Sequence, residues 1–246
     1  MDYFKELFYR ESKFGGFSDI DGTIAFYTRI NALISSPDVV LDIGCGRGEF
    51  LEDEVVYRRN LRDLRGKVKK VVGIDVDPVS SENQSIDEYY QIVDGTEWPI
   101  KDNSIDLAFS DQVLEHIQDP EFFFNECKRV IKKEGYLCIR TTNSWGYIAL
   151  GASILPNRLH SKILKRIQND RSEEDVFPTV FRCNSIHRIK HQLSRIDFDS
   201  CVYGYDAEPA YFSFSNIVYG IIKYIHRICP NYFKTIIFSF ARKVDE

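Results

Sequence analysis

The chain has 246 residues, enough for one large α/β domain or two small ones, and its 43% hydrophobic and 14% aromatic content is that of a globular protein. Its net charge of −5 gives no overall field that would hold a polyanion, so nucleic acid is not an expected partner. Six scattered cysteines without a C-x-x-C pair, and no signal-like or membrane-length apolar run, argue against a zinc finger, a disulfide framework and a membrane span, and predict a cytoplasmic protein.

Helix-like and strand-like segments alternate along the first half of the chain. A helix is predicted at 22–35, a strand at Val39–Ile43, a helix from Gly48 to about Leu64, and strands at 68–74, 90–93 and 105–110. The strand runs at 39–43 and 68–74 end at glycines and at Asp75, respectively. This alternation favours a mostly parallel sheet with helices on both faces.

The second half continues the pattern with longer connections. A helix beginning at Pro120 is predicted over 120–133 and ended by Gly135, further strands at 136–140, 201–205 and 235–240, and a helix at 215–228 that packs on the sheet. The predicted fold is therefore a seven-stranded, Rossmann-like, doubly wound α/β sheet. Ligands of such sheets lie beyond the carboxyl ends of the strands, so the site is sought after strands one, two and four.

A glycine-rich turn follows the first strand. The sequence Asp42-Ile43-Gly44-Cys45-Gly46-Arg47-Gly48 lets the backbone approach a ligand closely, although a plain strand-to-helix turn is the alternative. Asp42 stands where a dinucleotide motif has an apolar residue, and a carboxylate there suits an ammonium group. Asp75, at the end of the second strand, is placed to accept hydrogen bonds from two ribose hydroxyls.

Two further segments border the same predicted crevice. Asp94-Gly95 follows the third strand, where a carboxylate accepts from an adenine amino group and glycine admits a flat ring; an ordinary Asp-Gly turn is the alternative. The fourth strand leads into Ser110-Asp111-Gln112-Val113-Leu114-Glu115-His116.

Together these segments resemble class I S-adenosylmethionine-dependent methyltransferases over about residues 37–145. VVLDIGCGRGEF is similar to the first motif of that family, VVGIDVDP to the second, and IDLAFSDQVLEHI with EGYLCIRTTN to the fourth and fifth. The resemblance implies that the seventh strand is antiparallel and that the cofactor is S-adenosylmethionine, converted to S-adenosylhomocysteine. Its implied cofactor-binding residues are Asp42, Gly44, Cys45, Gly46, Gly48, Asp75, Val76, Asp94, Gly95, Asp111 and Val113.

The resemblance also predicts one methyltransferase domain over residues 1–246. Within it, 37–145 form the cofactor-binding core, 146–213 an acceptor-side cap or insertion, and 214–246 the C-terminal helix and last strand. Two departures from the family pattern are an insertion at 57–70 and a helix-like stretch between the last two strands.

His116 is the candidate catalytic base, since an oxygen acceptor must lose a proton during methyl transfer. The alternative is that its imidazole only caps the following turn or touches the cofactor. Glu115-His116 also looks like part of an E-x-x-E-H metal site found in some methyltransferases, but Gln112 replaces the first carboxylate. A neutral amide is a weak ligand for a hard cation, so no metal is expected.

Aromatic and polar residues after the fifth strand are candidates for the acceptor pocket. The predicted substrate residues are Asn143, Trp145, Tyr147, Arg182 and Tyr205. EEDVFPTVFRCN, DAEPAYF and the basic insertion resemble a bacterial subgroup associated with surface-polysaccharide and glycoconjugate biosynthesis. An ordinary lid packed on the sheet is the alternative for these residues.

The predicted activity is methyl transfer of the EC 2.1.1 type to a sugar oxygen of a surface glycan or its precursor. The alternatives are a methyltransferase for a small apolar metabolite, such as a quinone or polyketide, and a non-catalytic protein that only binds the cofactor. The insertion holds seven basic residues against one acid, which favours either a solvated helix face or contact with phosphates of a lipid-linked glycan: Arg58, Arg59, Arg62, Arg65, Lys67, Lys69 and Lys70. Peripheral membrane contact is a further, less favoured alternative.

Overall fold

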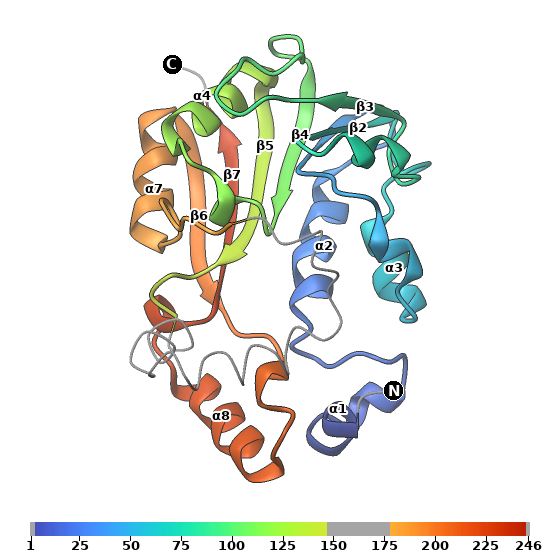
Figure 1. The fold of residues 1–246 in the computed structure, drawn as a ribbon, viewed down its shortest axis with the longest axis vertical. Helices are drawn as coiled ribbons and strands as arrows, with labels where there is room; N and C mark the ends of the chain where they lie inside the picture. Colours follow the sequence, from blue (N-terminus) through green and yellow to red (C-terminus); the bar gives the residue numbers. More distant parts are fainter. Residues whose placement is uncertain (1–2, 147–177, 245–246) are drawn as a thin grey trace.

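The computed structural model describes residues 3–146 and 178–244, whose elements surround one twisted sheet (Figure 1). The sheet has seven strands in the order β3-β2-β1-β4-β5-β7-β6. β1 to β5 pair in parallel, whereas β7 is inserted between β5 and β6 and is antiparallel to both. The strands are β1 (Val39–Ile43), β2 (Lys70–Asp75), β3 (Glu88–Gln91), β4 (Ile105–Asp111), β5 (Ile131–Thr142), β6 (Phe198–Tyr205) and β7 (Ile236–Lys243).

The described helices are α1 (Tyr3–Phe8), α2 (Gly22–Leu33), α3 (Val56–Arg62), α4 (Pro120–Val130), α7 (Ile186–Arg195) and α8 (Asn216–Ile228). Short 3₁₀ turns, among them η2 (Glu49–Glu52), η3 (Pro78–Glu82), η4 (Leu114–His116) and η6 (Ala210–Phe212), connect them to the strands. Side-chain caps help to begin α2 and α4, among other helices. Asp21 accepts hydrogen bonds from the backbone N–H groups of Thr23 and Ile24 (3.0 Å each). Asp119, which precedes Pro120, accepts one from the backbone N–H of Phe122.

Alternating strand residues divide the core between the two faces of the sheet. Leu41 and Ile43 of β1 face the layer formed by α4 and α7, where Phe124 is completely buried. Val40 faces the opposite layer, which contains Phe26 of α2. Burial of a side chain such as Phe124 contributes about 1.5–3 kcal/mol, so the two layers fix the sheet between them.

The seven-stranded α/β fold and its antiparallel β7 confirm the prediction, and so does the helix between the last two strands. The predicted 120–133 helix is wrong at its end, because α4 stops at Val130 and β5 begins at Ile131, which pairs with Ile105 before a register shift. Gly135 lies inside β5, where an added Cβ would stand 2.8 Å from the Asp106 carbonyl oxygen. Gly135 therefore permits a close strand approach rather than ending a helix.

Other segments also differ from the sequence-based expectation, and β6 and β7 extend beyond the predicted 201–205 and 235–240. The stretch predicted as one helix from Gly48 is η2 followed by α3, separated at Asp53, whose side chain bonds Val55 and Arg58. The third strand lies two residues earlier than predicted. α8 has one buried residue, Tyr219, and this ring packs on Phe8 of α1 rather than on the sheet.

The carboxyl ends of β4 and β5 point toward a pole formed by α1, η6 and α8 (Figure 1). Contacts between the two ends of the chain hold this pole together. Ser18 donates a 2.6 Å hydrogen bond to Glu208, and Lys5 lies 3.8 Å from the same carboxylate. Across residues 3–146 and 178–244, each helix is too short or too polar to cross a bilayer.

Candidate active site

The glycine-rich turn after β1 lies against the end of β2. The backbone N–H groups of Gly44 and Cys45 donate to the carbonyl oxygen of Ile74 (2.8 and 3.3 Å). From the other side, buried Asn83 donates its amide N–H groups to the carbonyls of Cys45 (2.8 Å) and Gly46 (3.1 Å). Asn83 follows η3 and lies outside the sequence motifs, so the sequence analysis did not predict its role.

Gly46 leaves room beside this turn. Its φ is +53°, and a Cβ added there would meet nothing within 4 Å, so an approaching ligand has access to the backbone. Gly95, in the loop after β3, likewise borders open space. Gly44 is different, because its missing Cβ lets Val113 approach; an added Cβ would stand 2.3 Å from a Val113 methyl. The turns after β1 and β4 therefore touch, as the predicted crevice requires.

Asp75 is a buried carboxylate whose orientation is fixed by the backbone. Its Oδ2 accepts from the N–H of Gly46 and its Oδ1 from that of Asp77, each at 2.9 Å. Each carboxylate oxygen can accept more than one hydrogen bond, so Asp75 retains acceptor capacity for the hydroxyls of a ligand. Val76 beside it is 43% exposed and presents an apolar surface at the same edge.

Asp42 and Asp111 place two more carboxylates at this edge of the sheet. Burial, followed by the negative charge of Asp111, raises the pKa of Asp42 to about 8, although Arg62 opposes the shift. Arg140 binds both oxygens of Asp111 (2.5 and 2.6 Å), and the hydroxyl of Tyr27 donates to the same carboxylate. A cationic ligand beside Asp42 would relieve its unfavourable ionisation, so the edge suits a positive charge.

Asp94 lies in an exposed loop three residues beyond the end of β3. Cys45 and Gly48 are buried in the glycine-rich turn, where burial raises the pKa of the Cys45 thiol well above its usual range. Such a thiol is a poor nucleophile at neutral pH, so Cys45 acts through packing and its backbone.

His116 ends the η4 turn after β4. Its Nδ1 lies 3.1 Å from the carbonyl oxygen of Pro178, which can only accept, so Nδ1 is placed to donate a hydrogen bond to it. The chain around Pro178 is held there by two further bonds, from the N–H groups of Val180 (2.8 Å) and Phe181 (3.1 Å) to the carbonyl of Glu115. The turn therefore holds the His116 ring through Nδ1.

Glu115 points into the protein rather than toward the open edge. It is 5% exposed, and its carboxylate accepts from the Thr141 hydroxyl at 2.7 Å. Asn184, also buried, donates to that hydroxyl at 2.6 Å. Burial raises the pKa of Glu115 despite the hydrogen bond from Thr141. Within the described ranges, no cluster of three or more His, Cys, Asp or Glu side chains could hold a metal ion.

The predicted substrate residues have different surroundings. The Asn143 side chain is occupied by the carbonyls of Tyr232 and Lys234 and by the N–H of Trp145, so it holds the loop after β5. Trp145 is 58% exposed and Arg182 is exposed. Tyr205 stacks on Phe238 with ring centres 4.6 Å apart, and Tyr147 lies outside the described residues.

Part of the basic insertion is neutralised by neighbouring carboxylates. Arg58 pairs with Asp53 and Asp21, and Arg65 pairs with Asp87 at 3.1 Å. Arg62 lies over the Phe50 ring, 4.4 Å from its centre. These contacts join α3 to the body of the protein, and with the pair between Lys70 and Glu88 they neutralise three of the seven basic residues.

Comparison with known proteins accounts for this geometry. Residues 41–139 match the family model described as a methyltransferase domain. This segment is therefore similar to a methyltransferase domain. The sheet superposes on a SAM-dependent methyltransferase from Archaeoglobus fulgidus with a TM-score of 0.53 at 19% identity, covering 95% of this chain and 98% of the other.

Two curated relatives match parts of the chain. An uncharacterized methyltransferase of Schizosaccharomyces pombe is 26% identical over 161 residues, which are 61% of this chain and 54% of the relative. A ubiquinone biosynthesis O-methyltransferase of Rhizobium leguminosarum is 29% identical over 104 residues, 42% of this chain and 40% of the relative. The matched segment thus spans about half of each relative's length.

Proposed function

We propose that this chain transfers the methyl group of S-adenosylmethionine to an acceptor oxygen. The observation that carries the proposal is the arrangement at the carboxyl ends of β1 and β2, where open Gly46, anchored Asp75 and half-buried Asp42 lie together. The Asp75 carboxylate can accept hydrogen bonds from ligand hydroxyls, and the Asp42 carboxylate beside it can bind a positive group. These features suit a ligand that carries a ribose and two positive groups. When bound, that ligand supplies a methyl group already activated on a sulfonium.

Each edge residue has a distinct role in this proposal. Asp75 accepts from the ribose hydroxyls, Asp42 binds the ammonium group, and Asp94 with Gly95 borders the adenine. The remaining predicted cofactor residues line or shape the site through backbone and packing: Gly44, Cys45, Gly48, Val76, Asp111 and Val113. Asp111 acts through its pair with Arg140, which keeps the carboxylate in place.

His116 removes the proton from the acceptor hydroxyl. The Pro178 carbonyl orients the imidazole through Nδ1, so Nε2 is the nitrogen that takes the proton. A base positioned in this way contributes about 10²–10⁴-fold to a rate.

The acceptor is a hydroxyl-bearing molecule of one of two classes. The sequence predicts a sugar of a surface glycan, a prediction that neither of the two relatives described above supports by its name. The name of the Rhizobium relative instead favours a small apolar metabolite of the quinone type. Exposed Trp145 would provide an apolar face for such an acceptor.

The decisive experiment is transfer of labelled methyl from S-adenosylmethionine. Purified protein is incubated with separated glycan, lipid and small-molecule fractions, and alkali-stable label on oxygen is expected in one of them. His116→Ala should lower the initial rate about 100-fold with cofactor affinity unchanged. His191→Ala, which removes an exposed histidine of α7, is the matched control and should retain the parent rate.

Three outcomes would contradict parts of the proposal. Normal cofactor binding without transfer to any fraction would favour a non-catalytic binding protein. Equal rates for the His116→Ala and parent proteins would exclude His116 as the base. Loss of turnover in EDTA with recovery in magnesium would show a metal requirement that the chain is not expected to have.

A further inference from the structure

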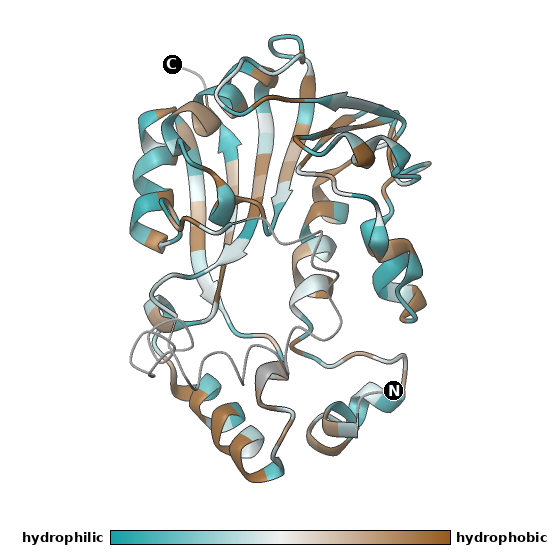
Figure 2. Ribbon diagram, viewed as in Figure 1, coloured by the Kyte–Doolittle hydropathy of each residue, from teal (hydrophilic) through white to brown (hydrophobic). Residues whose placement is uncertain are grey.

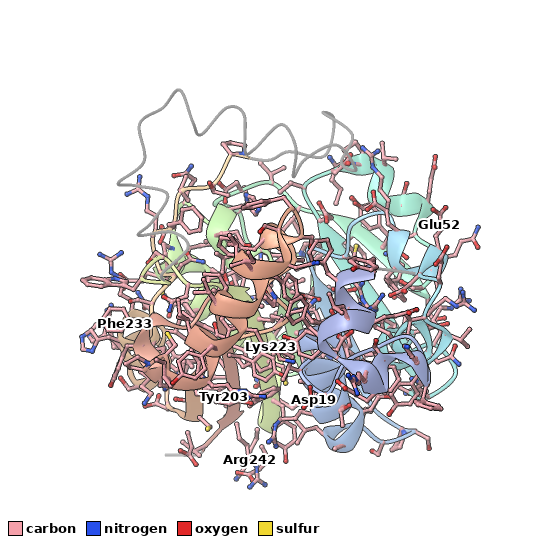
Figure 3. The ribbon with its side chains drawn as sticks, turned by 90° about the horizontal axis from the view of Figure 1, so that it is seen from below. Asp19, Glu52, Tyr203, Lys223, Phe233 and Arg242 are labelled. Atoms are coloured by element: carbon pink, nitrogen blue, oxygen red, sulfur yellow. The ribbon has the colours of Figure 1, made fainter. Side chains whose placement is uncertain are left out.

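α8 is attached to the protein by one face only. Tyr219 is buried there, 1% exposed, and stacks on Phe8 with ring centres 4.6 Å apart. Lys223 donates to the Phe8 carbonyl and lies 3.9 Å from the centre of the Tyr9 ring. Viewed from below, α8 and α1 lie side by side across this pole, with Lys223 between them (Figure 3). The N-terminal segment therefore fixes which face of α8 is presented outward.

The outward face of α8 is apolar. Ile217, Ile221, Tyr224 and Ile228, here called the α8 stripe, are 77%, 54%, 63% and 63% exposed. At about 100° per residue these four positions share a narrow face, roughly opposite Tyr219. Phe214 (63% exposed) and Tyr232 (62%) extend the apolar surface beyond both ends of the helix. The hydropathy colouring shows this apolar character along α8 (Figure 2).

Exposed apolar surface of this kind marks an interaction site in a soluble protein. A solvated helix places its large apolar residues inward, whereas α8 exposes four large apolar side chains besides buried Tyr219 and half-buried Val218, Ile222 and Ile225. The stripe therefore needs an occupant.

The charge of the surrounding segment indicates what that occupant is. From Pro209 to Thr235 the sequence contains no Asp or Glu but three basic residues, Lys223, Arg227 and Lys234, in a chain whose net charge is −5. Lys223 faces α1, whereas Arg227 is exposed on α8. A second copy docked stripe to stripe would bring the two Arg227 side chains toward each other without an acid on either α8 helix to pair with them. An anionic surface would attract Arg227 instead.

We propose that the α8 stripe docks on the surface of an anionic lipid bilayer. The stripe inserts into the headgroup boundary, its flanking tyrosine and phenylalanine rings lie at the interface, and Arg227 faces lipid phosphates. The pole that carries α8 is the one toward which β4 and β5 point, so docking brings the candidate active site toward the bilayer (Figure 1). Docking does not depend on methyl transfer, and its test is separate from that of the activity.

Flotation of the full-length protein with vesicles tests the proposal. Vesicles of phosphatidylcholine with about one third phosphatidylglycerol should carry the protein at low salt, and more weakly at high salt or without the anionic lipid. Ile221→Glu should lower partitioning at least tenfold. Val56→Glu is the matched control, because Val56 is also 54% exposed but lies on α3, and it should partition like the parent.

Two further variants separate insertion from simple attraction. Arg227→Gln should weaken partitioning about fivefold, the expected effect of one basic residue near an anionic surface. Ile221→Trp should show blue-shifted emission and quenching by brominated lipid, relative to the parent, whereas Val56→Trp should not.

Three results would overturn the proposal. The parent protein could fail to float with anionic vesicles at low salt. Ile221→Glu could instead abolish a dimer seen by sedimentation, which would assign the stripe to a second copy. Ile221→Glu could also lower the melting temperature as a buried substitution does, which would show that the stripe is covered within the chain.

Discussion

The two functional regions of this protein are held together over very different distances along the chain. At the glycine-rich edge, Asn83 bonds Cys45, 38 residues away, and Asp75 bonds Gly46, 29 residues away. At the α8 pole, Ser18 bonds Glu208 across 190 residues. These two edge contacts lie within one β-α-β segment that includes β1 and β2. The pole exists only after the two ends of the chain have met, so its surface follows from the complete fold.

The largest effect is expected at the edge, from Asp75→Asn. The amide keeps the size of the carboxylate but presents an N–H group where ligand hydroxyls need an acceptor. S-adenosylmethionine affinity should fall at least about 100-fold by calorimetry, which corresponds to about 2.7 kcal/mol. Asp77→Asn, two residues further and paired with Arg47, should change the affinity only a few-fold. If Asp75→Asn bound S-adenosylmethionine as tightly as the parent protein, the proposal that Asp75 binds this cofactor would be contradicted.

The next largest effect is the pH dependence that Asp42 gives to stability and to cofactor affinity. Its pKa, raised from 3.8 to about 8, keeps the proton on the folded protein while the unfolded chain releases it near pH 4. Stability is therefore lost as pH rises through this window, and it levels off above pH 8. A bound cation favours the ionised carboxylate, so affinity for S-adenosylmethionine should rise by up to about tenfold per pH unit toward pH 8.

Asp42→Asn is the test of that pH dependence. Calorimetry between pH 6 and 9 should show a steep approach to a plateau for the parent protein and a nearly flat profile for the variant. Proton release on binding, measured in buffers of different ionisation enthalpy, should disappear with the same substitution. A parent profile that is flat between pH 6 and 8 would contradict the assignment of a cationic group to Asp42.

Gly46→Ala should have a smaller effect, of about tenfold on affinity. Gly46 and Gly66 both have positive φ (+53° and +77°), and both border open space, so alanine costs each about 1–2 kcal/mol of backbone strain. Only Gly46 lies at the proposed cofactor edge. Gly66→Ala should therefore lower the melting temperature similarly while leaving binding unchanged. Equal losses of affinity in the two variants would mean that strain, rather than lost space for the ligand, is responsible.

The contrast between edge and pole also explains what the sequence could predict. Periodicity located β1 to the residue, and the order of strands and helices led to the correct sheet, because these patterns reflect neighbours along the chain. The start of β5 at Ile131 was missed, since pairing with Ile105 of β4 overrides the local helical pattern. Asn83, Asn184 and the bond from His116 to Pro178 depend on contacts between distant segments that no local pattern contains.

α8 shows the same limit from the other side. Its amphipathic pattern correctly predicted a helix but not its partner, because period alone does not say whether an apolar face meets the sheet, another helix or an external surface. The basic insertion is the converse case. Its composition allowed a phosphate-binding patch, yet partners from other segments, such as Asp21 and Asp87, pair with some of its basic residues. A residue's type indicates which interactions it can make, but only the fold shows whether a neighbouring residue already makes them.

The smallest expected effect distinguishes these two basic regions. Arg65 is 46% exposed at its side chain and pairs with Asp87 on the surface, so Arg65→Gln should change the free energy of unfolding by at most about 1 kcal/mol. Because its charge is already neutralised locally, Arg65→Gln should leave flotation with anionic vesicles unchanged, whereas Arg227→Gln weakens it. A loss of flotation equal to that of Arg227→Gln would mean that vesicle binding follows the total number of positive charges. Binding would then not depend on the apolar face of α8, and the proposal that α8 rather than the basic insertion docks on the bilayer would be contradicted.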